Sequence, residues 1–474
     1  MNELAFLSLS DLAAGIETRR ISPVDVTQAV LREIDRHDAR LKAYISVYHD
    51  QALQQAREAE QDILAGKYRG PLHGIPMGIK DNFFFQGRTT TIGSKIHGHF
   101  VPEYSATVVE KLAQAGVIFT GKLNLHEYAL GVTTENPHFG TCRNPWNENK
   151  IAGGSSGGAG VAIPCGMSVG SLGSDTSGSI RIPAACCGIV GLKPTYGLVS
   201  KFGCFPEAWS LDHVGPMART VADAALILDA ISGHDPRDPA SLELPPTRLA
   251  AHVSDDINGK VIGINEDFFF KDVDDSVASI VRHGIRCLED RGALIKPVDI
   301  RHIASAEYAI TIIDISETST VHHRALRERP QDYGDDVRFL LRCGELPSAV
   351  DYLEAQQIRS QLRDSFREVF NEVDVLVAPT LPIETPDVGQ KTSTINGKTV
   401  DAVASLMRLI GPSNLVGLPS VSVPCGALHG MPVGMQIVGA PLHEAAVMNI
   451  ARAVESAKLY TLAMPPCSGG RARA

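Results

Sequence analysis

The sequence predicts an α/β protein with a largely buried sheet, and three observations support this fold class. Short apolar runs separated by Gly, Pro and Asn begin near residue 71, and the runs 75–79 and 117–120 are typical of buried strands. The segment 107–115 between them has the apolar spacing of a helix. Further strand patterns return at 260–265, 375–379, 420–424 and 433–438. Alternating short strands and helices are characteristic of α/β architecture.

The N-terminal region is predicted to be helical over residues 8–65. Ser22 precedes Pro23, a combination typical of an N-cap followed by proline at the first helical position. The amphipathic stretch 52–64 is expected to end at Gly66. Such a helical arm could support a homodimer.

Composition and charge exclude several classes of protein. The chain has 474 residues, of which 44% are hydrophobic and 21% charged, and its net charge is −10. This is a globular composition, and an acidic balance argues against a general nucleic-acid binder. The nine cysteines include no Cys-x-x-Cys pair, as expected of a reduced chain. We therefore expect a cytoplasmic protein without a nucleic-acid partner.

Targeting and membrane segments are not expected either. The first residues lack the basic and apolar regions of a signal peptide. The uncharged stretch 151–174 is long, but it is rich in Gly and Ser and interrupted by Pro164, which makes it unsuitable for crossing a membrane.

Two short motifs match known patterns without their required context. Gly116 to Lys122 has the glycine and lysine spacing of a phosphate-binding loop, but Leu123 follows where Ser or Thr must hold Mg²⁺. Gly153 to Gly157 matches Gly-x-Ser-x-Gly, but a polar loop precedes it instead of a strand. The chain has no His-Glu-x-x-His motif and no Cys/His cluster at zinc spacing. We expect neither a metal nor an organic cofactor.

Glycine and small hydroxyl residues concentrate at three places that together permit one chemistry. Lys80 ends an apolar strand pattern, Ser155 and Ser156 lie in a glycine loop, and Ser179 follows a turn that contains Gly178. A buried lysine can lose its proton and act as a base, and one serine can relay a proton from another. A tight turn can direct several backbone N–H groups at a developing oxyanion.

A purely structural alternative remains open at this point. The glycine- and serine-rich loops could simply pack closely, with Lys80 paired to Asp81 or to another acid.

Taken in order, these motifs resemble the amidase signature family of serine hydrolases. The match includes Gly74-Ile-Pro-Met-Gly-Ile-Lys80-Asp-Asn and Gly173-Ser-Asp-Thr-Ser-Gly-Ser-Ile-Arg181. The other matching segments are 134–146, 153–158, 182–183, 188–194, 210–216, 378–380 and 414–424. The resemblance implies the amidase-signature fold, a large mixed β-sheet core covered on both sides by α-helices.

The resemblance also implies one domain over residues 1–474. We expect a helical arm at 1–65, the signature core at 70–232, a more variable region that forms the substrate pocket at 260–412, and a return to the core at 413–458.

The family's Ser–cis-Ser–Lys triad transfers residue by residue. Lys80 takes the place of the base, Ser155 that of the serine in a cis peptide, and Ser179 that of the nucleophile. The implied oxyanion hole consists of the backbone N–H groups of Thr176, Ser177, Gly178 and Ser179. Many members have Gly-Gly-Ser where this chain has Ser177-Gly178-Ser179. Supporting roles are implied for Ser156, Asp175 and Arg181.

Three functions of family members compete. The first is an amidase that hydrolyses a small-molecule amide, anilide, carbamate or ureido compound through an acyl-enzyme. The second is the glutamine-hydrolysing component of an aminoacyl-tRNA amidotransferase, and the third is a non-catalytic scaffold. The second is disfavoured because Met407 stands where that component has an Asp for the amino group of glutamine. The scaffold is disfavoured because every triad position is filled.

The expected pocket has apolar walls and prefers an aryl or alkyl amide over a zwitterionic amino acid. Its candidate lining residues are Gly131, Val132, Phe205, Trp209, Met407 and Ile410. Specificity is expected to lie in residues 300–350 and 380–412, where the resemblance is thinnest.

Overall fold

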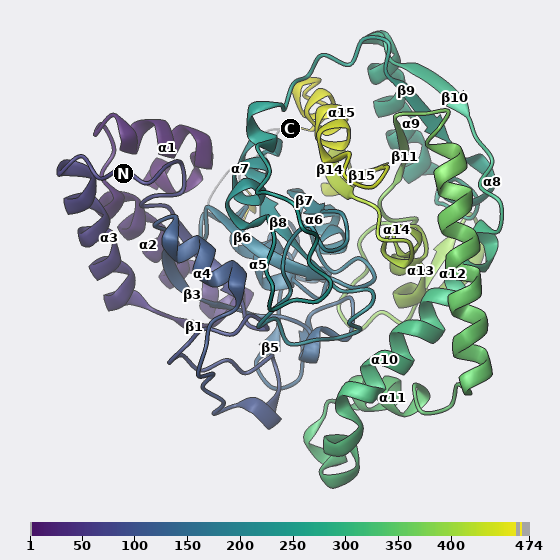
Figure 1. Cartoon of the computed structure of the whole chain (residues 1–474), viewed down its shortest axis with the longest axis horizontal. Helices are drawn as coiled ribbons and strands as arrows, with labels where there is room; N and C mark the ends of the chain where they lie inside the picture. The colour runs from purple at the N-terminus through teal and green to yellow at the C-terminus, as the bar shows by residue number, and fades with distance from the viewer. Residues whose placement is uncertain (1, 461–464, 467–474) are drawn as a thin grey trace.

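An eight-stranded mixed sheet forms the core of the molecule (Figure 1), as the sequence predicts. The structure, a computed structural model, describes residues 2–460 and 465–466. The pairs β10–β9 and β9–β11 are parallel, and the other neighbouring strands are antiparallel. The strands in spatial order are β10 (Leu294–Pro297), β9 (Val261–Ile264), β11 (Val375–Pro379), β15 (Met431–Gly439), β14 (Ser420–Leu428), β7 (Val190–Lys193), β8 (His213–Ala218) and β6 (Gly170–Asp175).

Helices cover both faces of this sheet. Along β15, Gly434 faces Ala185 of α6 (Arg181–Cys187), whereas the side chain of the next residue, Met435, reaches Gly284 of α9 (Asp275–Asp290). Successive residues of a strand point to opposite faces, so α6 and α9 lie on opposite sides. Helix α6 packs with α5 (Gly157–Ala162), and α9 packs with α15 (Glu444–Ser456), which in turn contacts α7 (Val221–Ile231).

A second sheet carries the strand that ends at Lys80. Its order is β1 (Tyr44–Val47), β3 (Ile118–Leu123) and β2 (Pro76–Lys80). The prediction of an all-helical region at 8–65 is therefore wrong at β1. Helix α2 (Pro23–Leu41) is followed by Lys42, whose φ of 55° is left-handed, and the chain then pairs antiparallel with β3. That pairing is a contact with a distant segment, which the local pattern does not encode.

Hydroxyl side chains join the two sheets. Gly78 of β2 donates its N–H to Ser168 Oγ at 3.0 Å, and its carbonyl accepts from Ser171 Oγ at 2.8 Å. Strand β2 therefore runs beside β6 at the edge of the large sheet. This arrangement brings the end of β2, with Lys80, next to the end of β6, with Ser174 and Asp175.

Two groups of helices lie at the ends of the molecule (Figure 1). The first is the N-terminal arm of α1 (Leu9–Glu17), α2 (Pro23–Leu41) and α3 (His49–Leu64). Ser22 caps α2 as predicted, because its side chain accepts from the N–H groups of Val24 and Asp25. The second group consists of α10 (Ala306–Glu328), α11 (Asp335–Cys343) and α12 (Ala349–Val369).

The remaining elements are short. They are α4 (Thr107–Gln114), α8 (Glu266–Phe269), α13 (Ala402–Arg408), α14 (Gly411–Leu415), β4 (Glu135–Asn136), β5 (Gly140–Thr141), β12 (Thr392–Ile395) and β13 (Lys398–Asp401). Within the part of the chain that is described, no helix combines the length and apolar character needed to cross a membrane.

Candidate active site

Lys80 is fully buried at the end of β2, and hydroxyl groups surround its ammonium nitrogen. Nζ lies 2.8 Å from Ser155 Oγ and 2.8 Å from Ser174 Oγ. The neighbouring Asp81 pairs instead with Lys122, at 3.1 Å. The structural alternative, in which Lys80 pairs with Asp81, is therefore wrong. Among the described residues, no carboxylate forms an ion pair with Lys80.

Burial without a paired carboxylate disfavours the charged form of Lys80. Burial lowers the pKa of its ammonium to about 8, and nearby acidic side chains limit the fall. An appreciable fraction of this amine is neutral near physiological pH, which is the form that accepts a proton.

Ser155 and Ser156 lie where a glycine loop enters α5. The peptide bond between Gly154 and Ser155 is cis, as the resemblance implies. Ser156 donates its N–H to the carbonyl of Ser179 at 3.2 Å and its hydroxyl to the carbonyl of Ser174 at 3.3 Å. This loop therefore lies directly against the segment 174–179, and Ser156 helps to position Ser179.

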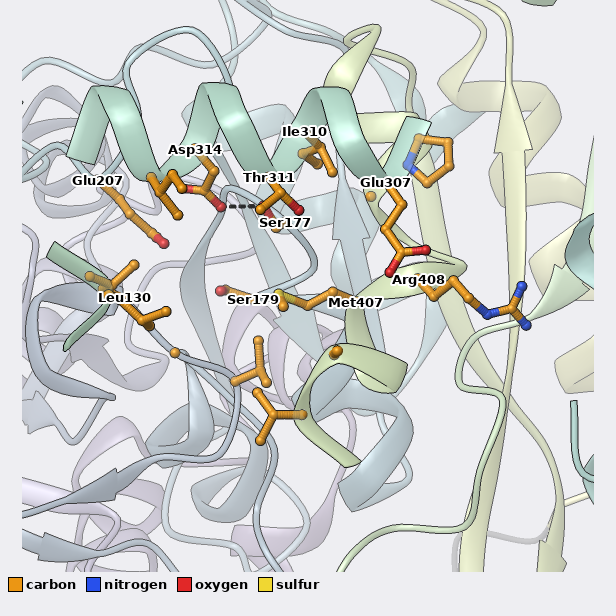
Figure 2. Close-up of a pocket in the computed structure, with 18 residues that line it drawn as sticks. Leu130, Ser177, Ser179, Glu207, Glu307, Ile310, Thr311, Asp314, Met407 and Arg408 are labelled. Atoms are coloured by element: carbon orange, nitrogen blue, oxygen red, sulfur yellow. Dashed lines mark hydrogen bonds between the residues drawn. The ribbon is translucent and has the colours of Figure 1, made fainter. Parts of the chain in front are cut away.

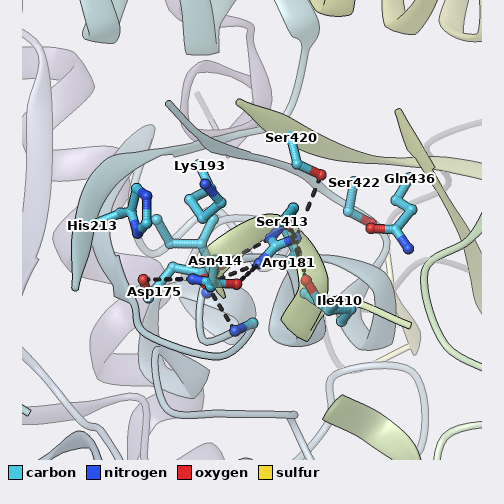
Figure 3. Close-up of polar contacts among 12 residues, drawn as sticks. Asp175, Arg181, Lys193, His213, Ile410, Ser413, Asn414, Ser420, Ser422 and Gln436 are labelled. Atoms are coloured by element: carbon cyan, nitrogen blue, oxygen red, sulfur yellow. Dashed lines mark hydrogen bonds and ion pairs between the residues drawn. The ribbon is translucent and has the colours of Figure 1, made fainter. Parts of the chain in front are cut away.

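A buried ion pair shapes that segment (Figure 3). Asp175 ends β6 and Arg181 begins α6, and the guanidinium donates to both carboxylate oxygens at 3.0 Å. The carboxylate also accepts the N–H groups of Gly178 at 2.8 Å and Ile180 at 3.1 Å. Arg181 holds the pKa of Asp175 well below its usual range, against the opposing effect of burial.

Helix α14 completes the surroundings of this pair. Asn414 donates to Asp175 Oδ1 at 2.8 Å and accepts from Arg181, whose guanidinium also donates to Ser413 Oγ at 2.6 Å. The pair thus links residues 175–181 to 413–414. These two α14 residues were not predicted as site residues, although Asn414 lies in a matching segment.

The hydrogen bonds to Asp175 correct the predicted oxyanion hole. The N–H of Gly178 is already donated to Asp175, so it does not point at a substrate oxygen. The backbone N–H groups of Thr176, Ser177 and Ser179 have no hydrogen-bond partner among the described residues. These three N–H groups remain as candidate donors.

Ser179 opens onto a cavity of about 180 Å³ (Figure 2). Its hydroxyl makes no hydrogen bond with any described residue, Ser155 included. Such contacts often tighten only when substrate binds. The walls are mainly apolar and include Leu130, Ile310, Ile315, Leu340, Val403 and Pro412.

The predicted pocket residues divide into two groups. Gly131, Val132 and Met407 line the cavity, as expected. Trp209 is 47% exposed and borders a separate surface pocket with Tyr196 and Lys201, so its predicted place is wrong.

Phe205 and Ile410 also lie outside the lining of the cavity. Phe205 packs against Tyr128 and His322, with ring centroids 5.4 and 5.8 Å away. Ile410 is buried, and its carbonyl accepts from Arg181 at 3.3 Å. Apolar character alone did not distinguish these core positions from pocket positions.

Sequence reasoning missed three acidic residues that line the cavity, Glu207, Glu307 and Asp314, and two of them, Glu207 and Asp314, contact the nucleophile segment. Asp314 Oδ2 accepts from Ser177 Oγ at 2.7 Å. Glu207 Oε2 lies 2.8 Å from the hydroxyl of Thr176. Both residues therefore contact the segment that carries Ser179. Asp314 falls within the predicted specificity range 300–350, but nothing in the sequence distinguished it from a surface acid.

Comparison with known proteins agrees with this geometry. The model of the family described as Amidase matches residues 25–448. The chain belongs to the amidase signature family. The A subunit of a glutamyl-tRNA(Gln) amidotransferase from Carboxydothermus hydrogenoformans is 38% identical, with 98% of this chain and 99% of that protein covered.

Solved structures of the family share the fold. A chain from a vestigial protein complex, described as revealing the origins of an s-triazine catabolic enzyme, matches with a TM-score of 0.92, at 33% identity over 96% of this chain and 100% of that one. A bacterial aryl acylamidase matches with a TM-score of 0.89, at 29% identity over 98% and 99% of the two chains.

Replacing Arg181 by Met should leave the carboxylate of Asp175 buried and unpaired. Removing one partner of a buried ion pair costs about 3–5 kcal/mol of unfolding free energy. Urea denaturation of wild type and Arg181→Met measures the difference. The control is Arg324→Met, because Arg324 is 88% exposed and pairs only with Glu328. Equal losses in the two variants would contradict the importance assigned to the buried pair.

Proposed function

We propose that this chain is an amidase that hydrolyses the C–N bond of a carboxamide, or of a related anilide, carbamate or ureido compound. The reaction passes through an acyl-enzyme on Ser179. One observation carries the proposal: the nitrogen of the buried Lys80 is bonded to the hydroxyl groups of Ser155 and Ser174, and no described carboxylate pairs with it. A lysine held for packing alone would be expected to have a counter-ion.

The first step needs a base and a relay. Neutral Lys80 accepts the proton of Ser155, to which it is already hydrogen-bonded at 2.8 Å. Ser155 in turn takes the proton of Ser179, whose oxygen then attacks the carbonyl carbon of the substrate. Ser174 Oγ accepts hydrogen bonds from the Lys80 nitrogen and, at 2.9 Å, from the Asn82 side chain. These two contacts fix the position of the amine.

The second step needs stabilisation of the oxyanion. The N–H groups of Thr176, Ser177 and Ser179 are the available donors, and the ion pair of Asp175 and Arg181 holds the turn that presents them. The tetrahedral intermediate collapses as the leaving nitrogen receives the proton stored on Lys80, passed back through Ser155. Water then hydrolyses the ester on Ser179 by the same relay, which yields the carboxylic acid and restores the enzyme.

The substrate is a small molecule. A cavity of about 180 Å³ is smaller than the roughly 300–1,000 Å³ typical of drug-sized ligands. Its apolar walls suit a short alkyl or aryl group. The proposed reaction needs no metal or organic cofactor, because the base, the relay and the oxyanion donors all belong to the chain.

Replacing Ser179 by Ala should abolish both turnover and labelling. A fluorophosphonate is expected to add one phosphonyl group to the wild type, and intact-protein mass spectrometry detects the increase. The Ser179→Ala variant should show no adduct, because the attacking oxygen is gone. The control variant Ser360→Ala removes an exposed serine of α12 and should label like the wild type. An adduct that persists in Ser179→Ala would refute the assigned nucleophile.

Activity should rise with pH along a limb centred near the Lys80 pKa of about 8. Only the neutral amine accepts a proton, so kcat/KM should fall as the pH drops below this value. The profile is measured with a short alkyl amide by ammonia release. Lys80→Met should be inactive across the range, whereas Lys391→Met, at an exposed position, should keep the wild-type profile. A wild-type rate that does not change between pH 6 and pH 9 would exclude a rate-limiting lysine base.

The relatives favour a second candidate, the glutamine-hydrolysing component of a glutamyl-tRNA(Gln) amidotransferase. Several relatives at 36–38% identity carry the name of that enzyme's A subunit. In that function the chain would act with partner subunits and tRNA, whereas the amidase needs only its substrate. Met407 at the cavity wall disfavours glutamine, because a thioether stands where that component has the Asp for its ammonium group.

Glutamine hydrolysis separates the two candidates. Butyramide is glutamine without its amino and carboxylate groups, so it serves as the matched control. The amidase proposal predicts that kcat/KM for glutamine is at least about tenfold below that for butyramide, a difference near 1.4 kcal/mol. Ammonia release from both compounds measures the ratio. A preference for glutamine would favour the amidotransferase function instead.

A further inference from the structure

Two carboxyl groups face the cavity beside the nucleophile segment. Glu207 lies in the loop between β7 and β8, and Asp314 lies on α10. Figure 2 shows the Glu207 carboxyl pointing into the cavity and Asp314 bonded to Ser177. Both acids line the same cavity as Ser179. The mechanism above uses neither of them.

The contacts of the Thr176 hydroxyl indicate which neighbouring carboxyl group holds a proton. Thr176 Oγ1 lies 2.8 Å from Glu207 Oε2 and 2.6 Å from Asp212 Oδ1. A hydroxyl has one proton, so it can donate to only one of these carboxyl groups. The other contact requires a proton on a carboxyl. Asp212 also accepts two backbone N–H groups, at 3.0 and 3.1 Å, which favours Asp212 as the ionised partner and Glu207 as the carboxyl that holds the proton.

The second oxygen of Glu207 has no partner among the described residues. The residue is buried, with a relative exposure of 6%, and only Oε2 is engaged by Thr176. Oε1 therefore presents an unused acceptor to the cavity. Because Oε1 borders the cavity, a ligand N–H group there could donate to it.

No cation in the lining of the cavity neutralises this acid pair. Arg408 is the only basic residue among the described lining residues. Its guanidinium donates to the carbonyls of Phe268, Lys271 and Asp272, on the far side from Glu207. The described residues also contain no group of three His, Cys, Asp or Glu side chains arranged to hold a metal ion.

Burial and mutual repulsion raise the pKa values of both carboxyl groups, which disfavours ionisation of both in the empty cavity. Burial and the neighbouring Asp314 raise the pKa of Glu207 well above its ordinary value. Burial also raises the pKa of Asp314 to about 7. Asp212, Glu317 and Lys80 also act on this pair, and Lys201 and Cys204 lie beyond Asp212. A further carboxyl group, that of Glu307 on α10, lines the same cavity.

We propose that Glu207 and Asp314 form a subsite for a protonated amine carried by the substrate, so that the chain acts on small amides with a cationic nitrogen. The ammonium donates to Glu207 Oε1 and to Asp314, while the carbon chain contacts the apolar walls. A substrate carboxylate in this region would be repelled, and no free guanidinium among the described lining residues is available to bind it. This inference rests on the proposed function, because it names the substrate class of the same site.

Binding of the cation releases a proton to solvent. The arriving ammonium stabilises the ionised carboxylates, so a proton held by the acid pair leaves as the complex forms. No covalent bond between heavy atoms changes in this step. The released proton is therefore a direct readout of the acid pair, which a merely structural role would not produce.

The test measures binding to the inactive Ser179→Ala protein by titration calorimetry at pH 7. The probes are ω-amino amides of two to six carbons, such as 4-aminobutyramide. Each is compared with the amide in which a methyl replaces the ammonium, here pentanamide. We expect the best cationic probe to bind at least about tenfold more tightly than its neutral counterpart, as a charge-assisted hydrogen bond predicts. Measurements in two buffers of different ionisation enthalpy should show release of up to about one proton.

Glu207→Gln and Asp314→Asn keep the size of each side chain and remove its charge. Each should reduce the preference for the cationic probe about tenfold or more and abolish most of the proton release. Glu328→Gln, at an exposed position of α10 paired with Arg324, should keep both the preference and the release. Two variants are used so that a folding defect in one, detected by a lowered Tm, leaves the other informative.

The outcomes for the subsite and for the catalytic proposal are separable. Equal or weaker binding of every cationic probe overturns the subsite, and so does a preference that survives both substitutions. In either case, hydrolysis of the neutral amides by the wild type leaves the amidase proposal standing. Conversely, selective binding with proton release supports the subsite even where the wild type hydrolyses no probe, and that result counts against the amidase proposal alone.

Discussion

The buried ion pair between Asp175 and Arg181 is the constraint on which the candidate site depends. The carboxylate binds the guanidinium, two N–H groups of the turn after β6 and the side chain of Asn414. One side chain therefore fixes the path of the nucleophile segment and its position against α14. The carboxylate of Asp175 also accepts the N–H of Gly178, so the backbone N–H groups left to bind an oxyanion are those of Thr176, Ser177 and Ser179.

The second constraint is the separation of two neighbouring charges at the end of β2. Asp81 is bound to Lys122, while Lys80, the residue before it, faces Ser155 and Ser174. Asp81 lies in the turn that follows β2, where its ion pair with Lys122 of β3 holds the acid away from the amine. Burial then acts on Lys80 without a counter-ion, which lowers its pKa and makes proton transfer accessible near neutral pH.

The sequence predicted features that are encoded locally and missed those that arise from distant contacts. Strand β11 was predicted to the residue, because 375–379 is a short apolar run between polar segments. The contact of Lys80 with Ser155 followed from the motif resemblance. Strand β1 was missed because it forms by pairing with the distant strand β3. Trp209 and Phe205 were misplaced because the apolar character of a residue does not say whether its side chain points into the cavity. Glu207 and Asp314 were missed because each resembles a surface acid until the fold brings both to one cavity.

An apolar pocket and a pair of acids are compatible because burial controls the charge of the acids. Two ionised carboxylates in a small cavity would repel each other and destabilise the fold. With a proton on Glu207 and the pKa of Asp314 raised to about 7, the empty acid pair carries less charge than two ionised carboxylates would. The proposal has the second charge develop when a cation arrives to balance it. The proposed subsite therefore combines apolar walls with selectivity for a charged group. Ionisation of both carboxyl groups, which is electrostatically unfavourable in the empty cavity, is balanced by the cation in the complex.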